Sequence, residues 1–458
     1  MTWKERALEA ETQVEELRQR VAELESKIAA LTKNSRNSSK PPSSDIVKPP
    51  KQQDRRRKRK IGGQKGHPRN LRKPFDADQV DQILEYTLDA CPKCHKTLTT
   101  TQESPKIRQQ IELVGRALII TEYRLPIYWC EHCQKFHRAK LPTIVKKSGL
   151  FGPALIAKVA YLKGECALSF QKIKKYFFHV YNVSISTGFL TKLIQKVSTA
   201  LEKPYDELKE QLPKEEHIHA DETGSKKNGE LHWTWCFRTS NFTLFHIDPS
   251  RGSVVLFNLL GNDFDGKISC DFFGAYQKFS KLSNASLLLC WAHLIREVKF
   301  LAEHKDKKVS RYGKRLLAEI ESMFKTIHRR GEILDRTWFR RMYEHQDAIL
   351  RVARCRVPPH QPALNLSVRI QVHRLSYFRF IETGLPPTNN LAEQSIRRVV
   401  LNRKVTQGTR SEGGNRWWER IWSVLSTCEQ QGRNVMIFLK SALESFLLGI
   451  ASQKLLEK

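Results

Sequence analysis

Three acidic residues, far apart in this chain, stand in local sequences that suit metal-dependent phosphodiester chemistry. Asp221 lies in HADETG, Asp271 in SCDFFGAY and Glu393 in PPTNNLAEQSIRR. The two-metal route needs oxygen ligands that hold two hard cations about 3.5 to 4 Å apart across the scissile phosphate. Taken singly, each acid is more often a helix cap, a turn residue or a salt-bridge partner. Taken together, they predict a catalytic site for Mg²⁺ or Mn²⁺.

Two strands are predicted to carry the first two acids. HIHADETG runs from an alternating segment into a turn, and two β-rich runs follow it, LHWTWCFRTS and FTLFHIDPSRG. Asp221 is therefore expected late on the first strand of a meander. KISCDFFGAY predicts a further short strand that ends at Asp271.

The third acid is predicted on a helix. Asn389 or Asn390 can cap this helix at its start, ahead of Glu393. Its partly apolar face would consist of Leu391, Ile396 and Val399. Two acids at strand ends and one on a later helix form a ribonuclease-H-like arrangement.

Several motifs, in order along nearly the whole chain, resemble those of the insertion-sequence-66 family of transposases, which are bacterial DDE recombinases. They are NSSKPPSSD, GGQKGH, HADETG, the Asp before GAY, CWAHLIREVKF and NNLAEQSIRRVVLNRK. The resemblance implies a ribonuclease-H-like core whose catalytic acids are Asp221, Asp271 and Glu393. The chain departs from the family at one point, because Phe272 and Phe273 separate the second Asp from Gly274, where the family has Gly directly after the acid.

The residues and the resemblance together predict a DDE transposase. Such a protein binds the terminal repeats of an insertion sequence and catalyses metal-dependent DNA strand cleavage and strand transfer. Its partners would be double-stranded DNA, both transposon ends and target, and small accessory proteins of the same element. The alternative is a catalytically inactive DNA-binding protein or repressor derived from a transposase, which the retention of all three acids disfavours.

The charge of the chain agrees with a nucleic-acid partner. The formal net charge is +31, from 79 Lys and Arg against 48 Asp and Glu. Residues 33–74 are rich in Pro, Ser, Gly and basic residues and are predicted to be a disordered linker. Within it, we expect six consecutive basic residues to contact DNA phosphates without sequence specificity, the alternative being a solvated linker: Arg55, Arg56, Arg57, Lys58, Arg59 and Lys60. No apolar run is long enough for a membrane span, so we expect a cytoplasmic protein that associates with the nucleoid when bound to DNA.

The first 32 residues show a heptad pattern. Val14, Val21 and Ile28 fall seven apart, and Leu17, Leu24 and Leu31 repeat three positions later. β-Branched a positions and Leu d positions favour a parallel dimer, so we predict a homo-oligomer through this coiled coil. The alternative is an amphipathic helix that packs on its own protein.

Four cysteines in two CxxC pairs predict a zinc ribbon over residues 75–145. Four thiolates with this spacing complete a tetrahedral structural zinc site and leave no position open for a substrate. The alternative of two disulfides is disfavoured in an intracellular protein. The predicted ligands are Cys91, Cys94, Cys130 and Cys133.

The remaining segments complete a multidomain α+β architecture. Residues 146–215 are predicted to be helical, as either a DNA-reading helix-turn-helix or a plain helical hairpin that supports the core. The core would occupy residues 216–299 and 384–458, with a helical insertion at 300–383. Basic residues that follow Glu393 are expected to clamp the scissile phosphates: Arg397, Arg398, Arg403 and Lys404.

Two short features of this half of the chain are predicted to have structural roles. Cys290 and His293 would pack and form hydrogen bonds, because a zinc site would need two further ligands that the sequence does not identify. For Trp417 and Trp418, core packing is favoured over stacking on an unpaired base.

Overall fold

The structure is a computed structural model, and it describes residues 13, 14, 17, 20, 21, 76–80, 83, 118–130, 132, 135–332 and 334–456. The chain divides into two compact units, residues 48–124 and the remainder. In residues 48–124 the structure describes a short 3₁₀ helix, η2 (Ala77–Gln79), and the extended stretch 118–124. The five described residues before position 30 include Val14, Leu17 and Val21, which are exposed. Most of the predicted coiled coil and all of the linker at 33–74 lie outside the described residues.

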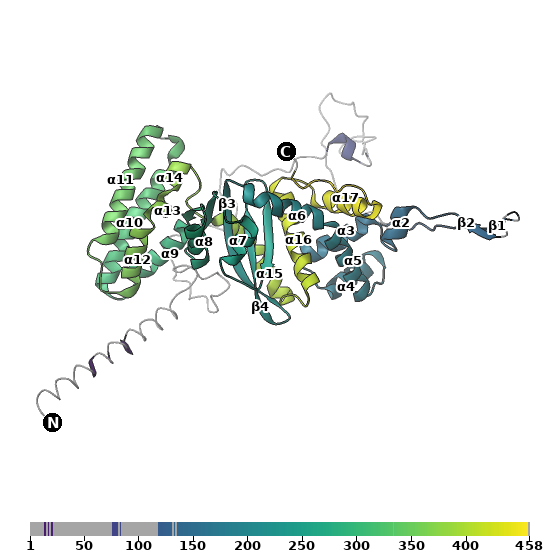
Figure 1. The fold of residues 1–458 in the computed structure, drawn as a ribbon, viewed down its shortest axis with the longest axis horizontal. Coiled ribbons are helices and arrows are strands. Elements are labelled where there is room, and N and C mark those ends of the chain that lie inside the picture. Colours follow the sequence, from purple (N-terminus) through teal and green to yellow (C-terminus); the bar gives the residue numbers. More distant parts are fainter. Residues whose placement is uncertain are drawn as a thin grey trace, which may run out of the picture. The chain divides into compact units, whose positions relative to one another are not determined.

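A five-stranded mixed sheet forms the centre of the larger unit (Figure 1). Its strands are β3 (His217–Lys227), β4 (Glu230–Arg238), β5 (Thr243–Asp248), β6 (Lys267–Cys270) and β7 (Ser286–Leu289). They lie in the order β5-β4-β3-β6-β7. The β3–β4 and β4–β5 pairs are antiparallel, whereas β3–β6 and β6–β7 are parallel.

Strand β3 is longer than the sequence analysis expected. HADETG does not run into a turn, because Gly224 pairs with Trp233 and the ladder with β4 continues to Lys227. The chain turns instead at Asn228 and Gly229, both with positive φ, as a two-residue hairpin loop favours. The expectation that Asp221 lies late on its strand is therefore wrong; it lies near the middle of β3.

Helix α16 (Glu412–Gln430) covers the edge strand of the sheet. Three backbone N–H groups of β5 donate to side chains one helical turn apart on α16: Thr243 to Thr427 at 3.1 Å, Phe245 to Ser423 at 2.9 Å and Ile247 to Glu419 at 2.6 Å. An exposed strand edge would leave these donors free for another chain. Every second residue of β5 faces a side chain on every fourth residue of α16. The buried polar side chains of α16 at these positions therefore accept hydrogen bonds from the strand. Trp417 and Trp418 of α16 are also buried, as predicted.

Helices before the sheet pack against this core. They are α2 (Thr143–Ser148), α3 (Pro153–Gly164), α4 (Phe170–Tyr181), α5 (Thr187–Ala200) and α6 (Glu202–Gln211), and η3 (Leu212–Lys214) follows. The Ser186 hydroxyl accepts the Phe189 N–H and caps the start of α5. Helix α5 packs on α3, α4, α16 and α17 (Val435–Leu448).

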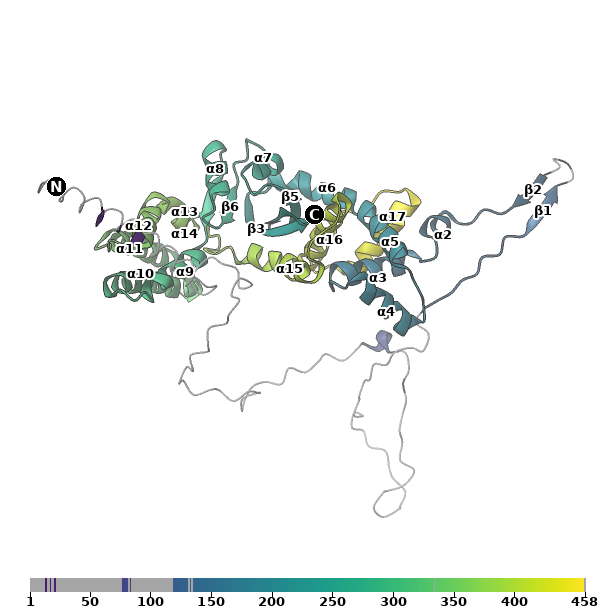
Figure 2. The ribbon, with the colours of Figure 1, turned by 90° about the horizontal axis from the view of Figure 1, so that it is seen from below.

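Along the chain, a group of helices lies between β7 and residues 384–458 (Figures 1 and 2). It consists of α9 (Trp291–Ala302), α10 (Lys307–His328), η4 (Arg330–Glu332), α11 (Asp335–Arg354), α12 (Gln361–Val372), α13 (Arg374–Phe378) and α14 (Phe380–Thr383). A Cβ at Gly313 would lie 2.3 Å from the backbone nitrogen of Ala302, so glycine allows α9 and α10 to approach closely. The boundary expected between 299 and 300 falls within α9.

Two further features complete the described part. Strands β1 (Ile127–Cys130) and β2 (Lys135–Arg138) form an antiparallel hairpin within the predicted ribbon. No helix among the described residues has the length and apolar character needed to span a membrane.

Candidate active site

The parallel register of β3 and β6 sets the first two acids side by side. The last paired residues of the two strands are His219 and Ser269. Asp221 and Asp271 each lie two residues further along, so both stand at the same level where the parallel ladder ends. Adjacent strands are about 4.8 Å apart, which brings the two aspartates into one site.

Helix α15 (Asn390–Thr406) carries Glu393 in its first turn and packs on β3 and β4. Ile396 and Val399 are buried as predicted, but Leu391 is exposed. On the sheet side, Arg238 of β4 donates to Ser395 of α15 at 2.9 Å. Arg238 pairs with His219, two residues before Asp221, so α15 covers the face of β3 from which Asp221 projects.

Asn389 fixes the start of α15 against the sheet. Its Nδ2 donates to the Ala220 carbonyl at 2.7 Å, and its Oδ1 lies 3.1 Å from Nδ1 of His219. Its backbone N–H donates to Sγ of Cys290 at 3.1 Å. Asn389 occupies the predicted cap position, but its side chain makes no capping hydrogen bond because it is bound to β3. It therefore holds Glu393 at a fixed place relative to Asp221.

The three acids interact electrostatically. Burial raises the pKa of Asp221 well above its usual range, and the charges of Glu222, Asp271 and Glu393 raise it further. Burial also raises the pKa of Asp271 to about 7, with Glu222 and Glu393 adding to the effect. Such mutual repulsion between carboxylates is relieved when a cation binds among them.

Glu222 is an acid of the site that the sequence analysis did not single out. Its side chain is 1% exposed, and Oε1 accepts from Nε and Nη2 of Arg251 at 3.0 and 2.8 Å. The Tyr276 hydroxyl donates to Oε2 at 2.7 Å. Glu222 projects from the face of β3 opposite to Asp221 and toward α8 (Gly274–Leu282), and both of its oxygens have partners. Its adjacency to Asp221 in HADETG was the available signal.

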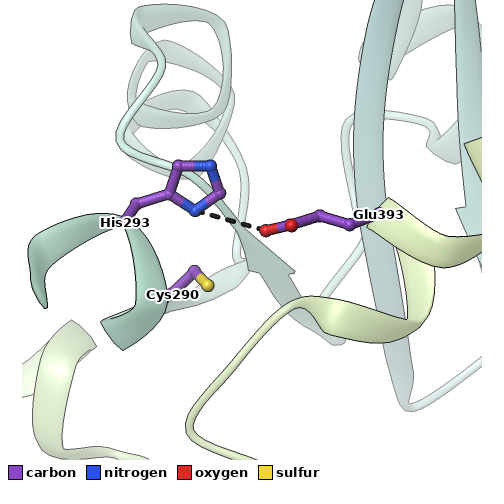
Figure 3. Close-up of side chains that lie close together, drawn as sticks. All are labelled: Cys290, His293 and Glu393. Carbon is purple, nitrogen blue, oxygen red and sulfur yellow. Dashed lines mark ion pairs between the residues drawn. The ribbon is translucent and has the colours of Figure 1, made fainter. Parts of the chain in front are cut away.

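Cys290 and His293, at the start of α9, lie beside Glu393 (Figure 3). Nδ1 of His293 is 3.5 Å from Oε1 of Glu393, and Nη2 of Arg296 is 3.3 Å from Oε2. Burial, with the charges of Arg296 and Arg369, lowers the pKa of His293 to about 4. Burial raises the pKa of Cys290 to about 11. The sequence analysis recorded Cys290 and His293 but could not place them next to Glu393.

The donor set suits hard divalent cations. Asp221, Asp271 and Glu393 offer only carboxylate oxygens, the ligands that Mg²⁺ and Mn²⁺ prefer. Burial and then the neighbouring carboxylates raise the pKa values of the two aspartates, and a bound cation would favour the charged form of both. The residues present therefore fit a catalytic metal site.

The basic residues of α15 differ in their surroundings. Arg397 and Lys404 are exposed. Arg398 contacts Glu165 and Glu429, and Arg403 donates to Thr223 and to the Gly224 carbonyl. The first pair is free to reach a phosphate, whereas the second pair fastens α15 to α3, α16 and β3.

Several predicted site residues fall outside the described part of the chain. These are the six basic residues 55–60 and the side chains of the four ribbon cysteines. Of those cysteines, only Cys130 has a described backbone, at the end of β1.

Comparison with known proteins identifies related sequences. A sequence profile described as "Transposase IS66 family" matches residues 148–416, which include all three acids. A profile described as "zinc-finger binding domain of transposase IS66" matches residues 89–134, which include the four CxxC cysteines. A family of unknown function matches residues 3–73.

One curated protein is similar over most of the chain. The uncharacterized protein y4qI of Sinorhizobium fredii (strain NBRC 101917 / NGR234) is 22% identical over 428 residues. The alignment covers 85% of this chain and 77% of that protein.

Proposed function

The chain belongs to the IS66 transposase family, and from this premise we propose that it is an active DDE transposase. It would bind the terminal repeats of an insertion sequence and catalyse metal-dependent strand cleavage and strand transfer. The observation that carries the proposal is the placement of three acids up to 172 positions apart in the sequence: Asp221 and Asp271 lie at one level beyond the parallel β3–β6 pairing, and Asn389 fastens the helix of Glu393 to β3.

We propose a ribonuclease-H-like catalytic core. In its favour are the mixed sheet, two acids just beyond the point where the parallel pairing of β3 and β6 ends, and a third acid on a later helix. We propose that this core is divided by the helices α9 to α14, as the sequence analysis expected for residues 300–383.

In the proposed mechanism, Asp221, Asp271 and Glu393 would hold a pair of Mg²⁺ or Mn²⁺ ions. When bound, these ions would activate the attacking oxygen and stabilise the charge that develops on the scissile phosphate. Asn389 keeps Glu393 in register with Asp221. Asp271, with a pKa of about 7, is only partly ionised at neutral pH, so a bound cation would favour its carboxylate form.

The bond changes need no covalent protein intermediate. Water first cleaves a phosphodiester at the transposon end and leaves a 3′-hydroxyl. That hydroxyl then attacks a phosphodiester of the target DNA, so one bond forms as another breaks. The chain's role is to position both DNA segments and to exclude competing nucleophiles.

DNA binding would be shared among several parts of the chain. We propose that the four ribbon cysteines bind a structural Zn²⁺. The basic segment 55–60, which precedes the ribbon, would then contact DNA phosphates. Arg397 and Lys404 would contact DNA near the acids. We propose that Arg398 and Arg403 act mainly by holding α15 in place, since both have protein partners. We also propose that the chain dimerises through residues 1–32 and that it acts with small accessory proteins of the same element.

Divalent-metal-dependent nicking tests this function. The full-length chain would be mixed with labelled DNA that carries the inverted repeat flanking its own gene, in Mg²⁺, Mn²⁺ or EDTA. We expect a nick at the repeat boundary in either metal and none in EDTA. Retarded DNA without any nick in either metal would favour an inactive, repressor-like protein.

A further inference from the structure

A second group of metal-ligating side chains lies against the carboxylate site. Sγ of Cys290, a ring nitrogen of His293 and a carboxylate oxygen of Glu393 all lie within 4.8 Å of one another (Figure 3). The first two belong to the start of α9 and the third to the first turn of α15. Cys290 is 3% exposed, and the three side chains converge on one point between the helices.

Two of the three ligand atoms are buried without a hydrogen bond. Within the described part of the chain, neither Nδ1 of His293 nor Oε1 of Glu393 has a hydrogen-bond partner. They are 3.5 Å apart. Two ligands of one tetrahedral Zn²⁺ are separated by about 3.3 Å when each bond is about 2.0 Å long. The observed separation fits a shared ion, and an unpaired buried polar atom is costly without one.

The third ligand is held in place from outside the group. Sγ of Cys290 accepts the backbone N–H of Asn389 at 3.1 Å. The backbone N–H of Trp291 donates to the Pro387 carbonyl at 3.0 Å, so the segment before α15 is fastened to the start of α9. Hydrogen bonds from backbone amides to a ligating sulfur orient it and stabilise its thiolate form.

We propose that Cys290, His293 and Glu393 form a Zn²⁺ site, distinct from the proposed pair of catalytic cations. A thiolate, an imidazole and a carboxylate suit zinc better than Mg²⁺, and three protein ligands leave the fourth position open to water. The choice of zinc follows from the sulfur of Cys290 and the ring nitrogen of His293.

The site would regulate the proposed transposase by competing for Glu393, a consequence that rests on the proposed function. Oε2 of Glu393 already faces Arg296 at 3.3 Å, so Oε1 is the oxygen available to a metal. A zinc ion that takes Oε1 withdraws it from the catalytic cations. Micromolar zinc would therefore inhibit Mg²⁺-dependent nicking, and His293→Gln would remove that inhibition.

Zinc content of the full-length chain tests the site without any DNA. After equilibration with Zn²⁺ and removal of loosely bound metal, the wild type should retain about two ions, one in the ribbon and one here. Cys290→Ala should lose one ion, whereas Cys428→Ala, another buried free cysteine, should lose none. Cys91→Ser should lose the ribbon ion and keep the other.

A second variant guards against misfolding of the cysteine mutant. His293→Gln keeps a polar side chain of similar size, and its zinc affinity at this site should fall at least about tenfold, because even outer-shell partners are worth that much. Asp271→Asn should keep both ions while losing nicking. Retention of only one ion by the wild type, unchanged in Cys290→Ala and His293→Gln, would overturn the proposal. The proposal would also be overturned if Asp271→Asn lost the second zinc ion while Cys290→Ala kept it. That result would place the second zinc among the carboxylates and would not count against the proposed catalytic site.

Discussion

Asp221 and Glu222 are sequence neighbours on β3, but their carboxylates project from opposite faces of the strand and meet different side chains. The Asp221 face meets Asp271 and Glu393, and its acids repel one another. The Glu222 face supplies Arg251 and Tyr276, which engage both carboxylate oxygens. Glu222 has protein partners for both oxygens, and we expect it to contribute to stability, whereas we propose that the acids on the Asp221 face bind a cation. Partners, rather than burial, distinguish the two roles.

The largest expected effect is loss of chemistry on the Asp221 face. Asp271→Asn keeps the shape of the side chain and removes the charge that holds a cation, so Mg²⁺-dependent nicking should fall by at least about three orders of magnitude. DNA binding, measured by retardation, should be retained because it depends on basic residues. The matched control is Asp265→Asn, an exposed acid just before β6, which should nick at the wild-type rate. The assignment of Asp271 to the metal site fails if Asp271→Asn nicks DNA at the wild-type rate and Asp265→Asn does not.

The Glu222 face should respond with stability rather than with chemistry. Glu222→Gln removes the buried charge opposite Arg251 and should lower the free energy of unfolding by about 2 kcal/mol. This is less than the roughly 3–5 kcal/mol for a fully buried pair, because Arg251 is 40% exposed. Denaturant unfolding measures the change. An unfolding free energy equal to that of the wild type, with nicking abolished, would move Glu222 into the catalytic set.

The pH dependence of stability should also differ between the faces. The pKa of Asp271 is raised to about 7 in the folded chain, so between about pH 4 and pH 7 the folded state binds a proton that the unfolded state has released. This group therefore loses its stabilising effect as the pH rises through 7. His217 and His293, whose pKa values are lowered to about 4, act in the opposite direction over part of this range. The comparison that isolates the aspartate is between wild type and Asp271→Asn.

Without divalent cations, the two proteins should melt at the same temperature near pH 4. Near pH 8, Asp271→Asn should melt about 2 °C or more above the wild type. Added Mg²⁺ should narrow that gap by stabilising the wild type alone. Differential scanning calorimetry at both pH values decides the matter, and a gap of the same size at pH 4 and pH 8 would argue against the raised pKa.

Deletion of residues 1–32 should have the smallest effect on nicking and on the stability of the core. The exposed Val14, Leu17 and Val21 would lose their partner chain, so the sedimentation mass should fall from dimer to monomer in moderate salt. Thermal stability of the core should be unchanged. A mass that is unaffected by the deletion would move dimerisation to another part of the chain.

The sequence predicted the acids better than it predicted their setting. Asp271 follows a short strand and Glu393 opens a helix, as the local patterns indicated. The length of β3 was missed because Gly224 resembles a turn residue, and only its pairing with β4 keeps it extended. A single sequence also cannot show which of Asp221 and Glu222 will be neutralised, since Arg251 and Tyr276 come from 29 and 54 positions away.

Long-range contacts explain the remaining misses. The Asn389 side chain was expected to cap α15, but the Ala220 carbonyl, 169 positions away, takes its amide instead. The basic residues of α15 look alike in the sequence, and only folding pairs Arg398 with Glu429 while leaving Arg397 exposed. His293 meets Glu393 only because the helices α9 to α14 return the chain to the same corner of the sheet.

Mn²⁺ binding by the full-length chain tests the central claim most directly, because it requires neither the cognate DNA nor turnover. The free-ion paramagnetic resonance signal of Mn²⁺ would be followed as protein is added, for the wild type, Asp221→Asn and the exposed control Asp263→Asn. The account predicts that Asp221→Asn binds at least about tenfold more weakly than the wild type and that Asp263→Asn binds equally well. Equal Mn²⁺ affinity in Asp221→Asn and the wild type would contradict the assignment of these acids as a metal site.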